Sequence, residues 1–189
     1  MPSSILEDFK GNLNDICRPN RFTVSIRSDN SNIDFGDEDY FFVKGCSIPG
    51  KTMGEIELNW MGHKYKVAGD PTFNDVTITF LNDLPATTDE FSVRNKFETW
   101  FSLISEDPSN IRTIHSDYKA TVFINQLNGK NEVVNTYKLI NAHPKELGDI
   151  ELSMESTDAV EEFTVVFSYS YVEYGDDDGQ SSGSSEVAE

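Results

Sequence analysis

Apolar and polar residues alternate with a period of two along most of this chain. In the segment FTVSIR at 22–27 every second residue is apolar, which is typical of a β-strand with one buried face. The pairs Met61-Gly62 and Asn128-Gly129 each separate two such runs and predict hairpin turns. Further runs that predict strands cover residues 40–48, 55–60, 63–68, 75–82, 119–127, 132–142, 149–154 and 161–174.

A helical period appears in the segment TDEFSVRNKFETWFSLIS at 88–105. Its apolar residues recur at i, i+4, i+7, i+8 and i+11, which predicts an amphipathic helix packed on a sheet. Thr88 or Asp89 is the expected N-cap, and Pro108 lies beyond the expected end. A short helix over residues 4–16 is also considered, although Gly11 interrupts it. The residues expected to pack the helix on the sheet are Val93, Phe97, Trp100, Phe101 and Ile104.

About eight strands and one central helix, without alternation of strands and helices, predict a mainly β fold. An antiparallel sandwich or barrel with one flanking α-helix satisfies these elements. We expect a single domain over 1–174, with residues 1–17 as an N-terminal arm. From Gly175 the sequence GDDDGQSSGSSEVAE has no apolar pattern, so residues 175–189 are expected to form a flexible acidic tail.

The chain is strongly acidic, and this narrows its partners. It has 189 residues, with 15 basic and 33 acidic ones and a net charge of −18. A body of this charge has few cations with which to bind nucleic acid phosphate; high solubility is the simplest alternative consequence. Two cysteines form no disulfide framework, and neither a secretory signal nor an apolar run of about 20 residues is visible. We therefore expect a soluble cytoplasmic product with reduced thiols.

No motif for catalysis or for cofactor binding stands out. The histidines at 63, 115 and 143 have no metal-ligand spacing, and no nucleophile elbow or phosphate loop is present. Cys46 lies in an apolar strand and is expected to act as a small buried hydrophobic residue. The acidic loop at 28–39 begins like a calcium loop, with Asp29, Ser31 and Asp34, but it lacks the glycine and glutamate of that motif. An exposed loop is expected there, with adventitious Ca²⁺ binding as the alternative, and no enzyme, metal or cofactor is predicted.

Three aspartates in KYKVAGDPTFNDVTITFLND, residues 64–83, raise the question of a carboxylate site. Asp70 precedes a proline and suits a corner, Asp75 directly precedes a predicted strand, and Asp83 follows one. Aspartate is favoured at such positions because its carboxylate bonds nearby backbone amides. Local structural roles are therefore expected rather than a metal or acid–base site.

Several segments together resemble the tail tube proteins of contractile-tailed bacteriophages, the T-even-like myovirus family. The resemblance covers residues 18–172, while the loop at 28–39 and the acidic tail depart from the family pattern. The segment VAGDPTFNDVTITFLND, followed by a helix with Arg94, Phe97 and Trp100, is the most specific of these. The other segments are RPNRFTVSI, FFVKGCSIPG, NWMGHKYK, RNKFETW, HPKELGDIELSMES and EEFTVVFSYSY.

The resemblance implies a structural protein of the virion tail, assembled in the host cytoplasm. Six copies would close a ring with a continuous inner β-barrel, and stacked rings would form a conduit inside a contractile sheath. The implied partners are further copies of the chain, the sheath protein, baseplate and tail-terminator proteins, and a tape measure protein in the lumen. DNA would pass without specific binding, and no membrane anchor is implied.

The resemblance also implies a role for residues 48–65 as the loop and hairpin that touch the neighbouring ring. The contact residues would be Met53, Trp60, Met61, His63 and Tyr65, although Trp60 as an ordinary core residue is the alternative. Two other functions are considered: a tube initiator or the tube of an injection system or bacteriocin, and an unrelated acidic β-sandwich that binds a small ligand or sugar.

Overall fold

The computed structural model describes residues 17–28, 30, 33, 35–36, 42–83, 92–106, 109, 111–155 and 159–175. The expected N-terminal helix, the possible calcium ligands Asp29, Ser31 and Asp34, and the acidic tail after Gly175 lie outside these residues. Seven antiparallel strands form the body, in the order β1-β8-β9-β10-β5-β2 with β11 also paired to β9. Their bounds are β1 Phe22–Arg27, β2 Val43–Cys46, β5 Val76–Leu81, β8 Ala120–Leu127, β9 Val133–Leu147, β10 Glu162–Ser168 and β11 Tyr171–Tyr174.

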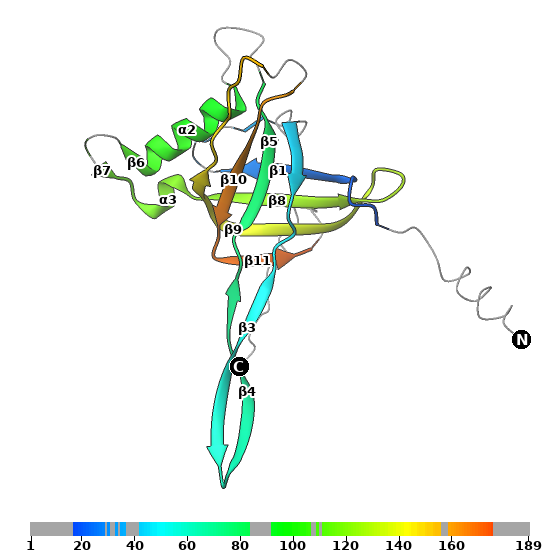
Figure 1. Cartoon of the computed structure of the whole chain (residues 1–189), viewed down its shortest axis with the longest axis vertical. Coiled ribbons are helices and arrows are strands. Elements are labelled where there is room, and N and C mark those ends of the chain that lie inside the picture. Colours follow the sequence, from blue (N-terminus) through cyan, green and yellow to red (C-terminus); the bar gives the residue numbers. More distant parts are fainter. Residues whose placement is uncertain are drawn as a thin grey trace, which may run out of the picture.

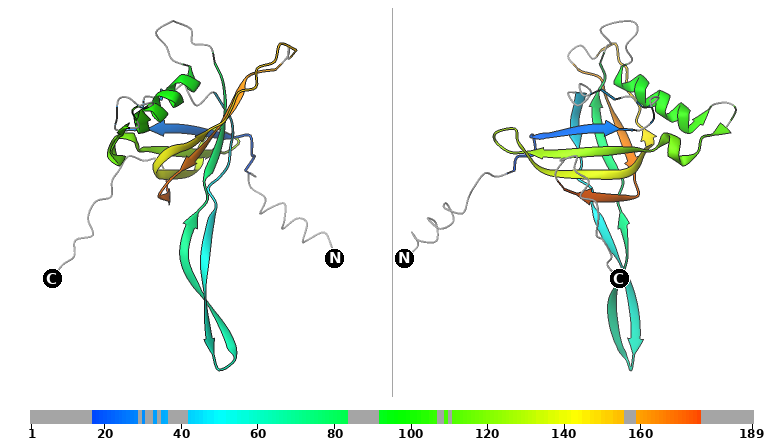
Figure 2. Two further views of the ribbon diagram at one scale, coloured as in Figure 1. Left: turned by 60° about the vertical axis from the view of Figure 1, so that its left-hand side comes forward. Right: turned by 180° about the vertical axis from the view of Figure 1, so that it is seen from behind.

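The long strand β9 joins two layers of the sheet. Its residues 133–142 pair with β8, and residues 143–147 pair with β10. Asn141, with φ 55°, lies where β9 changes partners. In Figure 1, β1, β8, β9 and β11 run across the view, whereas β10, β5 and β2 run along the long axis, and Figure 2 shows the same crossing from two other sides. The predicted mainly β, antiparallel sandwich or barrel fold is therefore confirmed.

The helix α2, Val93–Ile104, begins later than the sequence predicts. Ser92 is its N-cap, because the Ser92 hydroxyl accepts a hydrogen bond from the Asn95 N–H at 3.3 Å. The Asp83 carboxylate accepts a second one from the Val93 N–H at 3.0 Å. Two of the free N–H groups of the first turn are thus satisfied. The predicted N-cap, Thr88 or Asp89, is wrong. Both residues lie outside the described part of the chain, and the Ser92 and Asp83 oxygens cap a helix that begins at Val93.

An aromatic cluster centred on Phe97 joins the helix to the sheet. The Phe97 ring centroid lies 4.9 Å from that of Phe80, 6.1 Å from that of Phe163 and 6.0 Å from that of Phe167. The Trp100 indole N–H also donates to the Tyr118 carbonyl at 2.7 Å. The buried core residues come from the strands, from α2 and, for Ile33, from the segment between β1 and β2; they are Val24, Ile26, Ile33, Val76, Ile78, Phe80, Val93, Phe97, Trp100, Ala120, Val122, Ile124, Leu139, Ala142, Phe163, Val165 and Phe167.

The helix face that meets the sheet is narrower than the five-residue stripe in the sequence. Val93, Phe97 and Trp100 are buried, and Ile104 is half-buried against the core. Phe101 is half-buried and lies at the edge of this face. Phe101 directly follows the buried Trp100, so its side chain is rotated by about 100° around the helix axis. This rotation moves Phe101 away from the centre of the packed face and accounts for its greater exposure.

Two predicted strands and one predicted turn differ in the structure. Residues 149–154 form no strand; β9 instead extends to Leu147, Ile150 packs half-buried against the core, and Leu152 and Met154 are exposed. The run at 161–174 is divided at residues 169–170 into β10 and β11, which pair with different parts of β9. Asn128-Gly129 opens a five-residue loop, 128–132, rather than a two-residue turn. The Asn128 side-chain oxygen there accepts from the backbone N–H groups of Lys130 and Glu132, which favours the longer loop.

Short elements complete the described fold. The strands β6, Ser105–Glu106, and β7, Ile111–Arg112, form a two-stranded ladder directly after α2. A four-residue helix α3, His115–Tyr118, then leads into β8 and was not predicted. None of the helices in the described part of the chain is long and apolar enough to cross a membrane.

Candidate functional site

A long hairpin projects from the sheet body and is the most distinctive surface of the molecule. Its strands are β3, Lys51–Trp60, and β4, His63–Phe73 (Figure 1). Every residue of β3 is exposed, as is every residue of β4 except the half-buried Gly69 and Phe73. A two-stranded hairpin without a packing partner is only marginally stable in water. Its length and isolation make it the candidate interaction surface of this chain.

The two faces of the hairpin differ sharply in chemistry. Residues directly opposite one another in an antiparallel pair share a face, and the faces alternate along each strand. The pairs 56–67, 58–65 and 60–63 therefore lie on one face and the pairs 55–68, 57–66 and 59–64 on the other. The first set is the apolar hairpin face: Ile56, Leu58, Trp60, His63, Tyr65 and Val67. The second set is the polar hairpin face: Glu55, Glu57, Asn59, Lys64, Lys66 and Ala68.

The polar hairpin face holds two diagonal ion pairs. Lys64 lies 3.0 Å from a Glu57 carboxylate oxygen, and Lys66 lies 2.5 Å from one of Glu55. Exposed pairs of this kind contribute about 0–1 kcal/mol. They fix the register and keep this face compatible with water, but they do not account for the stability of so long a hairpin.

The apolar hairpin face is a contiguous exposed patch. The Trp60 side chain is 71% exposed and that of Tyr65 is 68% exposed. Removing apolar area from water yields about 25 cal/mol per Å², and large contiguous patches on soluble proteins mark interaction sites. The predicted contacts Trp60, His63 and Tyr65 all lie on this face. Met53 lies nearer the body and is also exposed.

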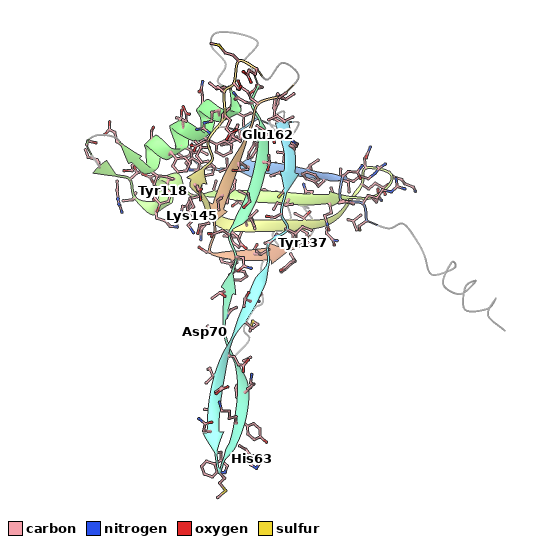
Figure 3. All side chains as sticks on the ribbon, viewed as in Figure 1. His63, Asp70, Tyr118, Tyr137, Lys145 and Glu162 are labelled. Atoms are coloured by element: carbon pink, nitrogen blue, oxygen red, sulfur yellow. The ribbon has the colours of Figure 1, made fainter. Side chains whose placement is uncertain are left out.

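A bulge in the hairpin replaces the corner that the Gly-Asp-Pro sequence predicts. The ladder shifts register opposite Gly54, where β4 has two residues, Gly69 and Asp70, against one on β3. A Cβ on Gly54 would lie 3.1 Å from the Asp70 carbonyl oxygen, and one on Gly69 would lie 3.1 Å from the Gly54 carbonyl carbon. The two glycines therefore let the strands approach closely where they cross, near Asp70 in Figure 3. Because a bulge twists the pair but does not end it, β4 continues through Pro71.

The tip of the hairpin has an unusual turn residue. Met61 has φ 46° and Gly62 has φ 80°, the two positive values that a type I′ turn requires. The other described non-glycine residues with positive φ are both asparagines, Asn131 and Asn141. A methionine in this region costs roughly 1–2 kcal/mol. Since Met61 is also 86% exposed, neither turn chemistry nor burial within the chain accounts for its presence.

We expect Met61→Asn to separate the effect of this residue on turn stability from its effect on assembly. Asparagine tolerates the left-handed conformation, so the melting temperature should stay equal or rise, whereas assembly should weaken because the apolar side chain is lost. Circular dichroism melts and sedimentation velocity would measure the two effects. Gly62→Ala is the matched control, since it strains the turn and keeps Met61. Assembly of Met61→Asn at wild-type concentrations would contradict a contact at the tip.

The three aspartates of 64–83 have separate local roles. Asp70 lies in the hairpin bulge, and Asp83 caps α2. Asp75 directly precedes β5, and one of its carboxylate oxygens lies 2.6 Å from the Lys145 ammonium. Hydrogen bonding and attraction to Asp75 raise the pKa of Lys145. The positions of Asp75 and Asp83 at strand ends agree with the sequence prediction, whereas the expected corner at Asp70 is wrong.

The histidines do not form a metal site. His63 lies at the hairpin tip, while His115 and His143 belong to the body, with ring centroids 6.4 Å apart and Tyr118 beside both. Burial, followed by repulsion from His115, lowers the pKa of His143. Among the residues that the structure describes, no group of three or more His, Cys, Asp or Glu side chains is placed to hold a metal ion.

A cavity of about 270 Å³ brings the two cysteines to one place. It is lined by the segment that leads into β1 and by residues in or next to β2 and β8, with Cys17 at its exposed side and Cys46 half-buried. Burial raises the pKa of the Cys46 thiol to about 12. At pH 8 only about one part in ten thousand of Cys46 is then thiolate, the reactive form.

We therefore expect the two cysteines to differ in reactivity. Iodoacetamide at pH 8 should label Cys17 rapidly and Cys46 only after unfolding, with tryptic mass spectrometry identifying the labelled peptide. A urea-unfolded sample provides the control in which both thiols react. Equal labelling rates in the folded chain would refute the burial of Cys46.

Three members of the apolar hairpin face were not singled out from the sequence. Ile56 and Leu58 alternate with charged residues before the turn, and Val67 does so after it. Pairing the strands around a two-residue turn places these residues with Trp60 and Tyr65. The alternation of apolar and polar residues therefore indicates the whole face, but only when the position of the two-residue turn is known.

Three strands of the seven-stranded sheet present open edges in the described part of the chain. There β1 pairs only with β8, β2 only with β5, and β11 only with β9. Open edges expose unpaired N–H and C=O groups that can pair with a strand of another chain. Together with the hairpin, they are the surfaces through which this fold can join other copies.

Comparisons with known proteins give a consistent result. A family model described as phage tail tube protein matches residues 17–174. The chain is 27% identical over 161 residues to the tail tube protein gp19 of Enterobacteria phage T4, covering 84% of this chain and 92% of the relative. It is 28% identical over 150 residues to the tail tube protein of Serratia phage KSP90, covering 79% and 82%. A chain in the PVC sheath-tube complex of an extracellular contractile injection system shares the fold, with a TM-score of 0.60, 18% identity and coverage of 93% and 97%.

Proposed function

The chain belongs to the phage tail tube protein family, whose members are components of the virion tail, and we propose that it acts there as a repeating subunit stacked through its hairpin. The apolar hairpin face is the observation that carries this proposal. Ile56, Leu58, Trp60 and Tyr65 form an exposed apolar row, and contiguous apolar surface of this kind marks an interaction site rather than the free surface of a monomer. In a stacked tube each hairpin would be covered by a neighbouring copy.

A ring of six copies would use a different part of the subunit. The open edges of β1, β2 and β11 provide backbone donors and acceptors for strands of adjacent copies. Pairing of edges around a closed ring yields a continuous inner β-barrel and removes the exposed edges. Heterologous contacts between identical subunits either close into rings or extend into filaments, so ring closure and stacking together produce a tube.

The proposed role of the tube is that of a passive conduit for DNA. The chain has a net charge of −18, and a wall without excess cations does not retain phosphate. We place DNA in the lumen without specific binding and propose no catalysis. A filter-binding assay at physiological salt should show no retention of duplex DNA by assembled particles. Tight, salt-sensitive retention would contradict the conduit.

The proposed protein partners follow from the position of such a tube. A contractile sheath would surround it, baseplate and tail-terminator proteins would occupy its ends, and a tape measure protein would fill its lumen before DNA passes. Assembly would take place in the host cytoplasm. The solved fold relative from a sheath-tube complex makes the sheath protein the first partner to test.

Analytical ultracentrifugation of the full chain tests the proposed assembly. At micromolar concentration we expect a population with the mass of six copies and a faster population of stacked rings. Guanidinium at a concentration too low to unfold the subunit should shift the larger species toward the smaller. A single species with the mass of one copy at all concentrations would contradict the proposal.

A further inference from the structure

A second exposed apolar surface lies at the opposite end of the molecule from the hairpin tip. It belongs to the distal loop, by which we mean the described residues 148–155 and 159–161 between β9 and β10. Its Leu152 is 79% exposed, and Met154 and Val160 are also exposed. Figure 1 places this loop, coloured yellow to orange, at one end of the long axis and the Met61-Gly62 turn at the other. Each subunit therefore has an unpartnered apolar surface at both ends of its longest dimension.

The two ends also differ in charge. Residues 146–162 contain seven acidic residues and no basic one, and the described acids Asp149, Glu151, Glu155 and Glu161 are exposed. Residues 51–68 contain three lysines and two glutamates, a net charge of +1 in a chain of −18. Opposite charges across a contact favour the correct partner and orientation. Lys64 and Lys66 are paired with Glu57 and Glu55, so the hairpin suits the acidic distal loop because it carries no excess negative charge, as well as through its apolar character.

We propose that the distal loop is the receptor for the hairpin tip of a second copy of this chain. Leu152, Met154 and Val160 cover Trp60 and Met61 of that copy, and the acidic residues of the loop meet a hairpin that adds no net negative charge. This inference rests on the proposed function, because it assigns the surface on which the hairpin docks. Since donor and receptor are different surfaces at opposite ends, the contact is heterologous and repeats in one direction.

Variants blocked at one end test this pairing. Trp60→Glu disables the hairpin and leaves the loop intact, whereas Met154→Glu disables the loop and leaves the hairpin intact. Both side chains are exposed, so neither change should lower the melting temperature. Each variant alone should fail to elongate. Mixed together, they should form one junction between an intact hairpin and an intact loop, and the particle mass in native mass spectrometry should double.

The matched control mixture contains two variants blocked at the same end. Trp60→Glu with Met61→Glu has no intact hairpin, so its particle mass should not change. Doubling in this control, or normal elongation of Met154→Glu, would overturn the assignment, and so would a mixture of Trp60→Glu and Met154→Glu that stays unpaired. If the wild-type chain forms tubes while Met154→Glu also forms them, only the distal loop is refuted. If the wild-type chain forms none, the proposed function itself fails.

Cross-linking locates the contact directly. Met61→Cys and Met154→Cys, each made with Cys17→Ser, are assembled together and treated with a short bismaleimide. A cross-linked pair with one copy of each variant is expected. Met61→Cys mixed with Val134→Cys, which replaces an exposed residue of β9, should give at least tenfold less product. Equal yields from the two mixtures would overturn the proposal.

Discussion

Replacing Trp60 by Ala should abolish tube formation and leave the subunit folded. The side chain is 71% exposed on the apolar hairpin face, so its removal takes no contact from the core. In a covered interface, truncating a tryptophan at a central position costs about 2 kcal/mol or more per contact. The loss recurs at every subunit of every ring, which is why elongation should stop rather than slow. Sedimentation velocity would measure assembly, and circular dichroism would measure the fold.

The two tryptophans of this chain provide an internal control. Trp100 is buried against the sheet, whereas Trp60 is exposed. Assembly of the wild-type chain should therefore shift the fluorescence emission to shorter wavelength as Trp60 leaves water. Trp60→Phe should retain part of the assembly and lose the shift. Tubes of Trp60→Ala at wild-type concentrations, or an emission spectrum unchanged by assembly, would show that Trp60 is not in the interface.

Replacing Phe97 by Ala should destabilise the fold by about 3–5 kcal/mol. The ring is fully buried and contacts the rings of Phe80, Phe163 and Phe167 from two different strands. No nearby side chain on the sheet can fill the resulting cavity without leaving its own contacts. Urea denaturation followed by circular dichroism would give the change in the free energy of unfolding.

Phe101→Ala is the matched control for this prediction. It removes the same side chain from the same helix, but Phe101 is only half-buried, so the loss should be clearly smaller. An unfolding free energy of Phe97→Ala close to that of the wild type would refute the role of Phe97 in joining helix and sheet. Equal losses for the two variants would place the packed face of the helix elsewhere.

Much of the fold could be predicted because local pattern and tertiary structure agree there. The alternation at 22–27 corresponds to β1, which spans the same residues, and the Met61-Gly62 pair closes the hairpin as expected. The distal loop was misread as a strand because Ile150, Leu152 and Met154 alternate with polar residues. Alternation alone does not show whether a neighbouring strand is available. In the structure β10 pairs with β9 at residues 143–147, and this pairing does not continue into the distal loop.

The start of the helix and the bulge required information from distant residues. Asp83 caps α2 from ten positions upstream, so the local candidates at 88 and 89 were misleading. Gly-Asp-Pro reads as a corner until Gly54 is seen opposite it on β3. Of the apolar hairpin face, the sequence singled out Trp60, His63 and Tyr65, whereas Ile56, Leu58 and Val67 join them only once the register of the hairpin is known. The exposure of this face depends on how far the hairpin projects from the body. No local sequence pattern encodes that distance.

Membership of the tail tube family removes one of the alternative functions. The match over residues 17–174 excludes an unrelated acidic sandwich that binds a small ligand. The likeness to an injection-system tube is one of fold, because tubes of different particles share this architecture. A tube initiator or an injection-system tube would present the same hairpin but different partners at its ends, so binding to a sheath protein of phage origin distinguishes them.

Negative-stain electron microscopy of the purified full-length chain tests the central claim most directly. The account predicts hollow tubes built from stacked rings with a six-fold outline, and short stacks or single rings at lower concentration. The Met61→Asn variant on the adjacent grid should show shorter stacks with the same ring outline. A field of single subunits at a concentration where the fold is intact, without rings or tubes, would contradict it.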